Sequence, residues 1–171
     1  MSSRGRLTDT VTTVSSFNTN ESMAQIESDA RPMVVVVVGD TGTGKSFCVH
    51  GFRFDDQREY IGGSTYGVEV HSMYAPGGQK YIIYDTAGQY RGIDPTKWLR
   101  HASLVVRFER TGGPGGRLYA SELSSENARR ARLHEAPLPC IVATDFDRSR
   151  NMVTDIREEI EDALFIMNQT K

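Results

Sequence analysis

Apolar runs alternate along the chain with segments whose apolar residues recur at helical spacing. The run at 33–38 holds five consecutive valines without polar alternation, which is typical of a parallel strand buried on both faces. The predicted strands are 33–38, 65–74, 81–85, 103–108 and 140–143. The predicted helices are 45–54, one opening at Asp94-Pro95, 123–133, and one marked by Val153, Ile156, Ile160, Leu164 and Met167. This order predicts a three-layer α/β domain with a mostly parallel sheet.

Local signals refine this arrangement. The turn Ala75-Pro-Gly-Gly78 makes the second and third strands an antiparallel hairpin. At the helix opening, Asp94 is a cap and Pro95 suits the first helical position, while Trp98 on that helix is expected to pack in the core. The glycine-rich segment 111–116 is expected to form a flexible loop.

The first 32 residues are rich in Ser, Thr and Asn and lack apolar periodicity, so we expect a disordered arm at 1–32 and a single domain at 33–171. The net charge of −2 gives no electrostatic case for nucleic acid, and no segment approaches the roughly 20 apolar residues of a membrane span. Cys48 and Cys140 are expected to be buried in a reducing compartment. The four histidines, His50, His71, His101 and His134, show no ligand spacing, so no site with protein metal ligands is predicted from them.

The first strand leads into Gly39-Asp-Thr-Gly-Thr-Gly-Lys45-Ser46, which has the form G-x-x-x-x-G-K-S. Its glycines let the backbone coil so that N–H groups point at an anion. Lys45 adds a positive charge for the β- and γ-phosphates, and the Ser46 hydroxyl can bind Mg²⁺ where the helix begins. A chance match is the alternative, but the valine strand before the loop argues against it. The residues of this segment expected to bind the nucleotide are Gly39, Asp40, Thr41, Gly42, Thr43, Gly44, Lys45, Ser46 and Phe47.

Two further segments follow, Thr65-Tyr-Gly67-Val-Glu-Val-His71 and Tyr81-Ile-Ile-Tyr-Asp85-Thr-Ala-Gly88-Gln89. With them, the chain resembles the Ras-like small GTPases, and the segment after Thr65 resembles the Ran branch most. The resemblance covers about 33–147 and is strongest up to Gln89. It implies a P-loop NTPase fold whose ligand, GTP or GDP, lies beyond the carboxyl ends of the strands.

Each matched residue has a chemical role. Asp85, which alone would be an ordinary strand-end acid, can hold a water on the Mg²⁺ that Ser46 binds. The resemblance implies that Thr65 joins the metal and the γ-phosphate, that Gly88 donates its N–H to that phosphate, and that Gln89 orients the attacking water. The implied catalytic residues are Gln89, Lys45 and Thr65, and the implied Mg²⁺ ligands are Ser46, Thr65 and Asp85.

The base-recognition segment departs from the family pattern Asn-Lys-x-Asp, because this chain has Thr144-Asp145-Phe146-Asp147. Asp147 remains where a carboxylate would accept from guanine, and Thr144 is a mild change. Asp145 replaces a lysine whose stem packs on the purine, so it removes packing and adds a charge near the base. The alternative is that Phe146 or a shifted loop covers the base.

Two other departures concern rate and completeness. Thr41 occupies a loop position where a side chain would crowd Gln89 or an incoming arginine, which predicts slow hydrolysis. After Asp147 the family continues with a strand, a loop and a helix, whereas here one amphipathic helix follows, and this leaves open that the last strand or helix is missing. Its acidic face is expected to be solvated and comprises Glu158, Glu159, Glu161 and Asp162. The ending Asn168-Gln-Thr-Lys171 lacks a cysteine for a prenyl group, so no lipid anchor is expected.

Three functions stay open at this point. The first is an Mg²⁺-dependent GTP-binding switch with slow hydrolysis, whose Thr65 and Gln89 regions meet effector, exchange and activating proteins in the cytoplasm or nucleus. The second is a pseudo-GTPase scaffold that binds nucleotide weakly or not at all, favoured by Asp145 and the short C-terminal part. The third is a P-loop phosphotransferase or ATPase of another lineage, disfavoured by Asp147.

Overall fold

The computed structural model describes residues 31–52, 68–86, 88, 96–113 and 115–170. The chain divides into two units, Met1–Arg31 and Pro32–Lys171, and the description below concerns the second. The arm expected at 1–32 lies almost entirely outside the described residues, as do Thr65, Gln89 and the helix opening at Asp94-Pro95.

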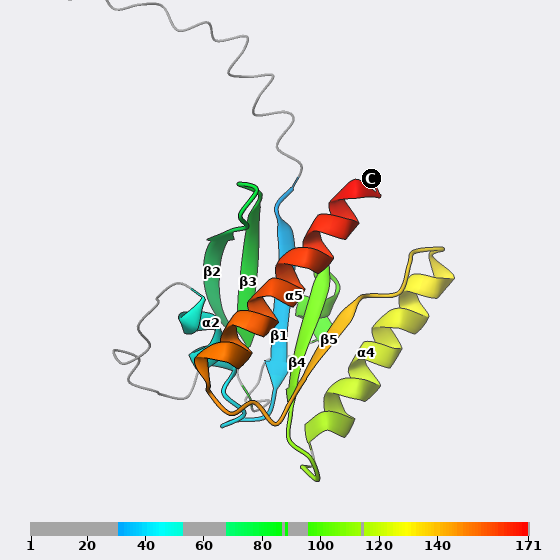
Figure 1. Cartoon of the computed structure of the whole chain (residues 1–171). Helices are drawn as coiled ribbons and strands as arrows, with labels where there is room; N and C mark the ends of the chain where they lie inside the picture. The colour runs from blue at the N-terminus through cyan, green and yellow to red at the C-terminus, as the bar shows by residue number, and fades with distance from the viewer. Residues whose placement is uncertain (1–30, 53–67, 87, 89–95, 114, 171) are drawn as a thin grey trace, which may run out of the picture. The chain divides into compact units, whose positions relative to one another are not determined.

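The described residues form an α/β domain with a mostly parallel five-stranded sheet in the order β2-β3-β1-β4-β5 (Figure 1). The strands are β1 (Met33–Gly39), β2 (Val68–Tyr74), β3 (Lys80–Thr86), β4 (Leu104–Glu109) and β5 (Cys140–Thr144). The β1–β3, β1–β4 and β4–β5 pairs are parallel, and β2–β3 is the predicted antiparallel hairpin. The valine strand β1 is central, as its unbroken apolar sequence predicts.

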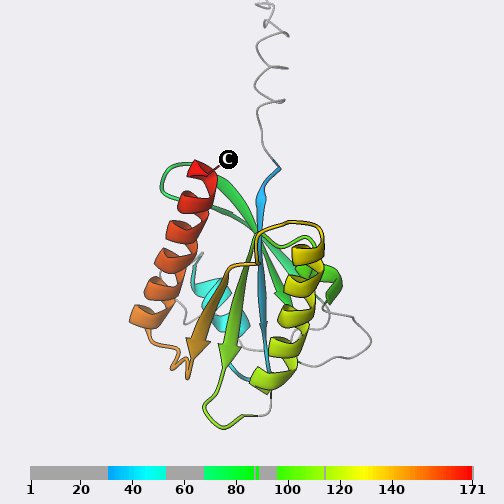
Figure 2. The ribbon, with the colours of Figure 1, turned by 90° about the vertical axis from the view of Figure 1, so that its right-hand side faces the viewer.

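Helices cover both faces of this sheet, and Figure 2 shows α4 and α5 on opposite sides of it. The helices are α2 (Lys45–Gly51), α3 (Thr96–Leu99), α4 (Gly115–Arg132) and α5 (Arg150–Gln169). Val35 and Val37 pack into a core with α2 and α5, whereas Val36 and Val38 pack into a second core with Leu99 of α3. The alternation of side chains along β1 therefore supplies both cores.

Three predicted elements need correction. The first helix ends at Gly51, with Phe52 after it, rather than at 54. The segment 111–116 is not wholly a loop, because Gly115 and Gly116 begin α4, which thus starts eight residues before the predicted 123. Glycine costs a helix only about 1 kcal/mol, an amount that the rest of an 18-residue helix outweighs.

The prediction that the strand at 140–143 is buried is wrong. β5 lies at the edge of the described sheet, and only Ala143 in it is buried, while Val142 is 44% exposed. Cys140 is accordingly half-buried rather than in the core, whereas Cys48 on α2 is fully buried as predicted.

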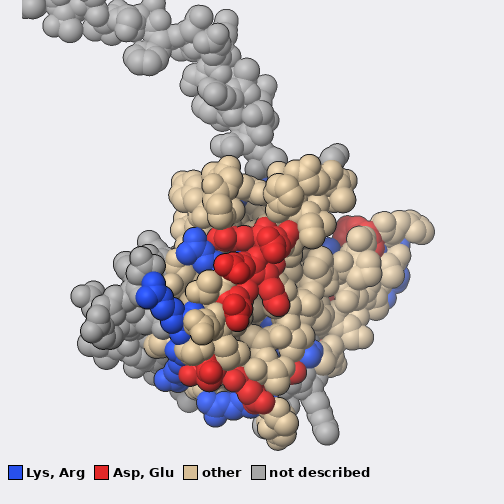
Figure 3. Space-filling view, viewed as in Figure 1, with Lys and Arg blue, Asp and Glu red and all other residues tan. Residues whose placement is uncertain are grey.

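The last helix, α5, has the predicted amphipathic pattern. Ser149 caps it by accepting a hydrogen bond from the Met152 N–H. Its apolar stripe is buried and comprises Val153, Ile156, Ile160 and Leu164. Acidic side chains gather on its outer face, where Figure 3 shows a red patch over α5. Glu161 is the partial exception to the solvated face, because it accepts hydrogen bonds from Tyr81 and Arg157.

Trp98 packs edge-on against Tyr84 of β3 at a ring distance of 5.2 Å, which confirms the expectation of core packing. No helix within the described part of the chain is long and apolar enough to cross a membrane.

Candidate nucleotide site

The parallel strands bring the predicted site residues to one edge of the sheet. Since β1, β3, β4 and β5 run in the same direction, their carboxyl ends share that edge. The glycine-rich loop leaves β1 there, Asp85 ends β3, and Thr144 ends β5. This arrangement is the one that the order of motifs in the sequence predicts.

The glycines of the loop after β1 adopt backbone angles that other residues avoid. Gly39, Gly42 and Gly44 have φ values of 146°, 80° and 91°. A Cβ atom at Gly39 would collide with the Phe108 carbonyl oxygen. At Gly42, in contrast, no atom of the described residues lies within 4 Å of the Cβ position, so the loop is open there. The coiled backbone and this opening suit a cradle for an anion.

Lys45 lies beneath the loop and is 5% exposed. Its Nζ donates hydrogen bonds to the carbonyl oxygens of Gly39, at 2.8 Å, and Asp40, at 2.9 Å. Burial lowers the pKa of Lys45, against the opposing effect of the carboxylates of Asp85 and Asp40. An ammonium group has three donors, so one remains for a ligand after these two carbonyls.

Asp85 is completely buried at the end of β3. Burial raises the pKa of its carboxyl to about 6, although Ser46 and then Lys45 act to lower it. The Ser46 hydroxyl favours the charged carboxylate without the geometry of a full hydrogen bond, and neither Asp85 oxygen has a hydrogen-bond partner among the described residues. A buried carboxylate short of partners, beside a hydroxyl, fits a hard divalent cation such as Mg²⁺.

Gly88 brings the segment after β3 against the glycine-rich loop. A Cβ atom at Gly88 would collide with the backbone nitrogen of Thr41, so only glycine fits this approach. Gly88 and the glycine-rich loop are therefore adjacent. Thr65 and Gln89, the other residues of these segments, lie outside the described residues.

Among the residues expected to recognise a base, Asp145 has a partner that the sequence analysis does not predict. Asp145 has a φ of 51°. Its carboxylate accepts two hydrogen bonds from Thr111, one from the backbone N–H at 2.9 Å and one from the hydroxyl at 2.5 Å. These bonds lower the pKa of Asp145. Asp145 thus joins the loop after β4 to the end of β5.

The other three residues of this segment have separate partners. The Thr144 hydroxyl donates to Glu109 at 3.3 Å. Asp147 is exposed and accepts the Ser149 N–H at 2.8 Å. The Ser149 side chain and then this backbone bond lower the pKa of Asp147. The ring of Phe146 lies over Gly44, where an added Cβ would be 2.5 Å from the ring. The aromatic side chain thus covers the start of α2.

Two features of this edge escape the sequence analysis. Phe146 packs with Phe47 and Phe108 at ring distances of 6.3 and 5.5 Å, forming an aromatic cluster between α2, β4 and the loop after β5. Arg110, directly after β4, donates a 2.6 Å hydrogen bond to the Gly42 carbonyl oxygen. Nothing local in the sequence marks either contact, because Arg110 and Gly42 are 68 positions apart.

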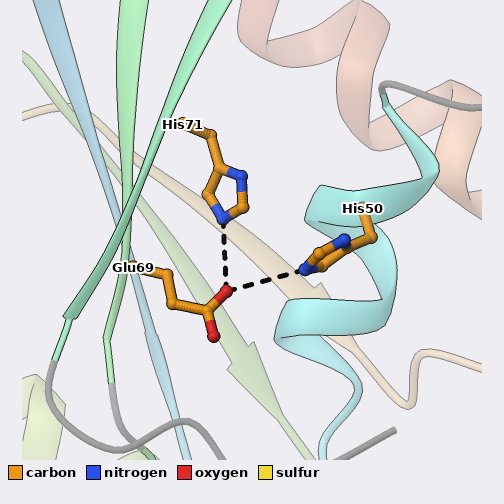
Figure 4. Close-up of side chains that lie close together, drawn as sticks. All are labelled: His50, Glu69 and His71. Atoms are coloured by element: carbon orange, nitrogen blue, oxygen red, sulfur yellow. Dashed lines mark ion pairs between the residues drawn. The ribbon is translucent and has the colours of Figure 1, made fainter. Parts of the chain in front are cut away.

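The histidines also form an arrangement that their sequence spacing does not predict. His50 of α2 and His71 of β2 both approach the Glu69 carboxylate (Figure 4). One signal was available, since residues 69 and 71 are two apart in a strand and share a face.

No protein-family model matches this chain, and no curated protein matches it significantly.

Proposed function

We propose that this protein is an Mg²⁺-dependent GTP-binding switch that hydrolyses GTP slowly to GDP. The observation that carries the proposal is the buried pair Lys45 and Asp85 beneath a loop of three left-handed glycines. Burying an ammonium group and a carboxylate costs free energy unless opposite charges and hydrogen bonds compensate it, and the Asp85 oxygens have no hydrogen-bond partner among the described residues. A triphosphate with Mg²⁺ provides this compensation, since its charges complement both groups.

In this proposal each residue of the site has a separate role in binding the phosphates, holding Mg²⁺ or positioning the attacking water. Lys45 binds the β- and γ-phosphates with its remaining donor, and the backbone N–H groups of the loop surround them. Ser46 and Asp85 hold Mg²⁺, directly and through water, and the ion neutralises charge that develops on the phosphates. Gln89 orients the attacking water and Thr65 senses the γ-phosphate, as the resemblance implies.

Thr41 accounts for the slow rate in this proposal. Gly88 lies directly against the Thr41 backbone, so Thr41 is at the point where the two segments proposed to contact phosphate meet. A β-branched side chain at that point restricts the positions that water and Gln89 can take.

Preference for guanine rests on Asp147, whose exposed carboxylate offers acceptors that the N–H and amine of guanine match. Asp145 keeps its charge, but its carboxylate is hydrogen-bonded to Thr111 in the loop after β4 and so has a partner of its own near the proposed base site.

A second candidate is a pseudo-GTPase scaffold that binds nucleotide weakly or not at all. Phe146 favours it, since its ring covers Gly44 at the start of α2. If that ring must move before a nucleotide binds, the cost reduces affinity.

The test is titration of the purified full chain with fluorescent GTP, GDP and ATP, in Mg²⁺ and in chelator, followed by a single-turnover hydrolysis assay. We expect GTP and GDP to bind more tightly than ATP, Mg²⁺ to strengthen GTP binding, and Gln89→Leu to abolish turnover. Lys45→Ala is the binding control and should lose triphosphate affinity. GTP binding without turnover, unchanged by Gln89→Leu, would favour the scaffold, and preference for ATP would refute both candidates.

A further inference from the structure

Three side chains from two elements converge at a point between α2 and β2. His50 comes from the second half of α2, while Glu69 and His71 project from the same face of β2 (Figure 4). Both imidazoles direct Nε2 at the same carboxylate oxygen, Oε2 of Glu69, at 3.6 Å from His50 and 3.5 Å from His71. The three atoms lie within 4.8 Å of one another.

These separations match the spacing of donors around one metal ion. Imidazole nitrogens and carboxylate oxygens lie about 2.0–2.2 Å from Zn²⁺, so tetrahedral geometry separates them by about 3.3–3.6 Å. Both histidine–glutamate distances are within or close to this range. The imidazoles need to approach each other by up to about 1.5 Å, which side-chain rotation at half-exposed His50 can supply.

The charges of the cluster also favour a cation. His71 is 6% exposed and its ring meets that of His50 edge-on, with ring centroids 5.2 Å apart. The cluster thus gathers two imidazole nitrogens and one carboxylate oxygen around a common point. Glu69 is 48% exposed, which opens the site to solvent.

We propose that His50, Glu69 and His71 bind a divalent transition-metal ion of the zinc class, distinct from the Mg²⁺ of the proposed nucleotide site. The donor set is two imidazoles and one carboxylate, a combination that selects Zn²⁺ over Mg²⁺ because imidazole is a poor ligand for hard ions. Each histidine binds through Nε2 with its proton on Nδ1. Water from the open side completes the fourth position.

The bound metal joins α2, which carries the end of the phosphate loop, to β2. This position links the metal site to the proposed switch, because Glu69 and His50 both act electrostatically on Asp85. The metal site itself does not depend on nucleotide binding, however, and its test needs no nucleotide.

The test is titration of the full chain with Zn²⁺ alone against a chromogenic zinc indicator, with Co²⁺ absorption as the measure of geometry. We expect one zinc ion per chain and the intense visible absorption of tetrahedral Co²⁺ with imidazole ligands. His50→Gln and Glu69→Gln change side chains with solvent exposure, which limits damage to the fold, and each should weaken zinc binding by more than about tenfold.

Two matched controls assign the metal. His101→Gln removes an exposed histidine outside the cluster and should leave the zinc affinity unchanged. Asp85→Asn removes the carboxylate expected to bind Mg²⁺. Because Asp85 interacts electrostatically with His50 and Glu69, the zinc affinity of this variant should shift, but by much less than in His50→Gln. Zinc binding that is equal in wild type and His50→Gln, that is lost in Asp85→Asn, or that is absent would overturn the proposal.

Discussion

Replacement of Asp85 by Asn should stabilise the protein while it abolishes the effect of Mg²⁺ on nucleotide binding. The pKa of the buried carboxyl is raised from 3.8 to about 6, which corresponds to about 3 kcal/mol of unfavourable free energy in the folded state at pH 7. Asn carries no charge, but its buried amide also needs hydrogen-bond partners. We therefore expect a net gain of about 1–3 kcal/mol in the free energy of unfolding at pH 7.

The pH dependence of wild-type stability follows from the pKa of Asp85 in the folded and unfolded states. Between about pH 4 and pH 6 the folded state retains a proton that the unfolded state has lost, so wild-type stability falls as the pH rises through this window. Above about pH 6 the full free-energy cost of the buried carboxylate is present, and below about pH 4 this cost is absent. The advantage of Asp85→Asn should therefore be largest at pH 7 and small at pH 4.

The assay is urea unfolding of the nucleotide-free protein in chelator at pH 4, 5, 6 and 7. Glu126→Gln is the matched control, because the side chain of Glu126 is also buried, at 4% exposure, but hydrogen bonds from Arg129 and Arg130 lower its pKa. The ionised Glu126 stabilises the fold above its unfolded pKa, and this contribution is lost as the pH falls through its folded pKa. Glu126→Gln should thus destabilise the protein at pH 7.

The reasoning from burial would be refuted if Asp85→Asn were less stable than wild type at pH 7. It would also be refuted if the variant exceeded wild type in stability by the same amount at pH 4 and at pH 7. In the nucleotide assay, the same variant should bind GTP with equal affinity in Mg²⁺ and in chelator. A retained Mg²⁺ effect would show that Asp85 does not take part in holding the ion.

Three further changes test the loop, the core and the rate. Gly44→Ala combines an unfavourable φ with a clash against the Phe146 ring, so thermal unfolding should show a loss of about 1–3 kcal/mol in the free energy of unfolding. Gly42→Ala is the control and should lose less, because Gly42 has a similar φ but no described neighbour. Equal losses would show that the clash does not matter. Ile160→Ala leaves a cavity in the core beneath α5 and should lower the free energy of unfolding, measured with urea, by about 2–5 kcal/mol. The exposed Ile166→Ala is the control and should lower it by about 0.5 kcal/mol or less. Similar values for the two variants would argue against α5 as a core element. Thr41→Gly should speed single-turnover GTP hydrolysis, and a rate no faster than wild type would count against steric hindrance at that position.

The sequence predicted best what depends on neighbouring residues. The five valines predicted a strand buried on both faces, and the alternation of Val35 to Val38 between the two cores fulfils that pattern. The glycine-rich loop was predictable for the same reason, since its spacing alone sets where Lys45 and the left-handed glycines fall.

Contacts between distant segments could not be predicted in this way. Asp145 reaches Thr111, 34 positions away, and nothing in the local sequence distinguishes that position from one beside a purine. His50 and Glu69 lie on different elements, so their convergence appears only once α2 packs beside β2. The exposure of β5 likewise depends on its place at the edge of the described sheet, which its apolar composition does not reveal.

The central position of β1 has a consequence for how the chain is made. Val35 pairs with Ile83 on one side and Leu104 on the other, both far downstream. At about 5–20 residues per second, a ribosome needs about 3–14 seconds to add the roughly 70 residues between the valine strand and its second partner. During that interval an uncharged, strongly β-prone segment lacks its native neighbours and is exposed to non-native strand pairing, the step from which aggregation starts.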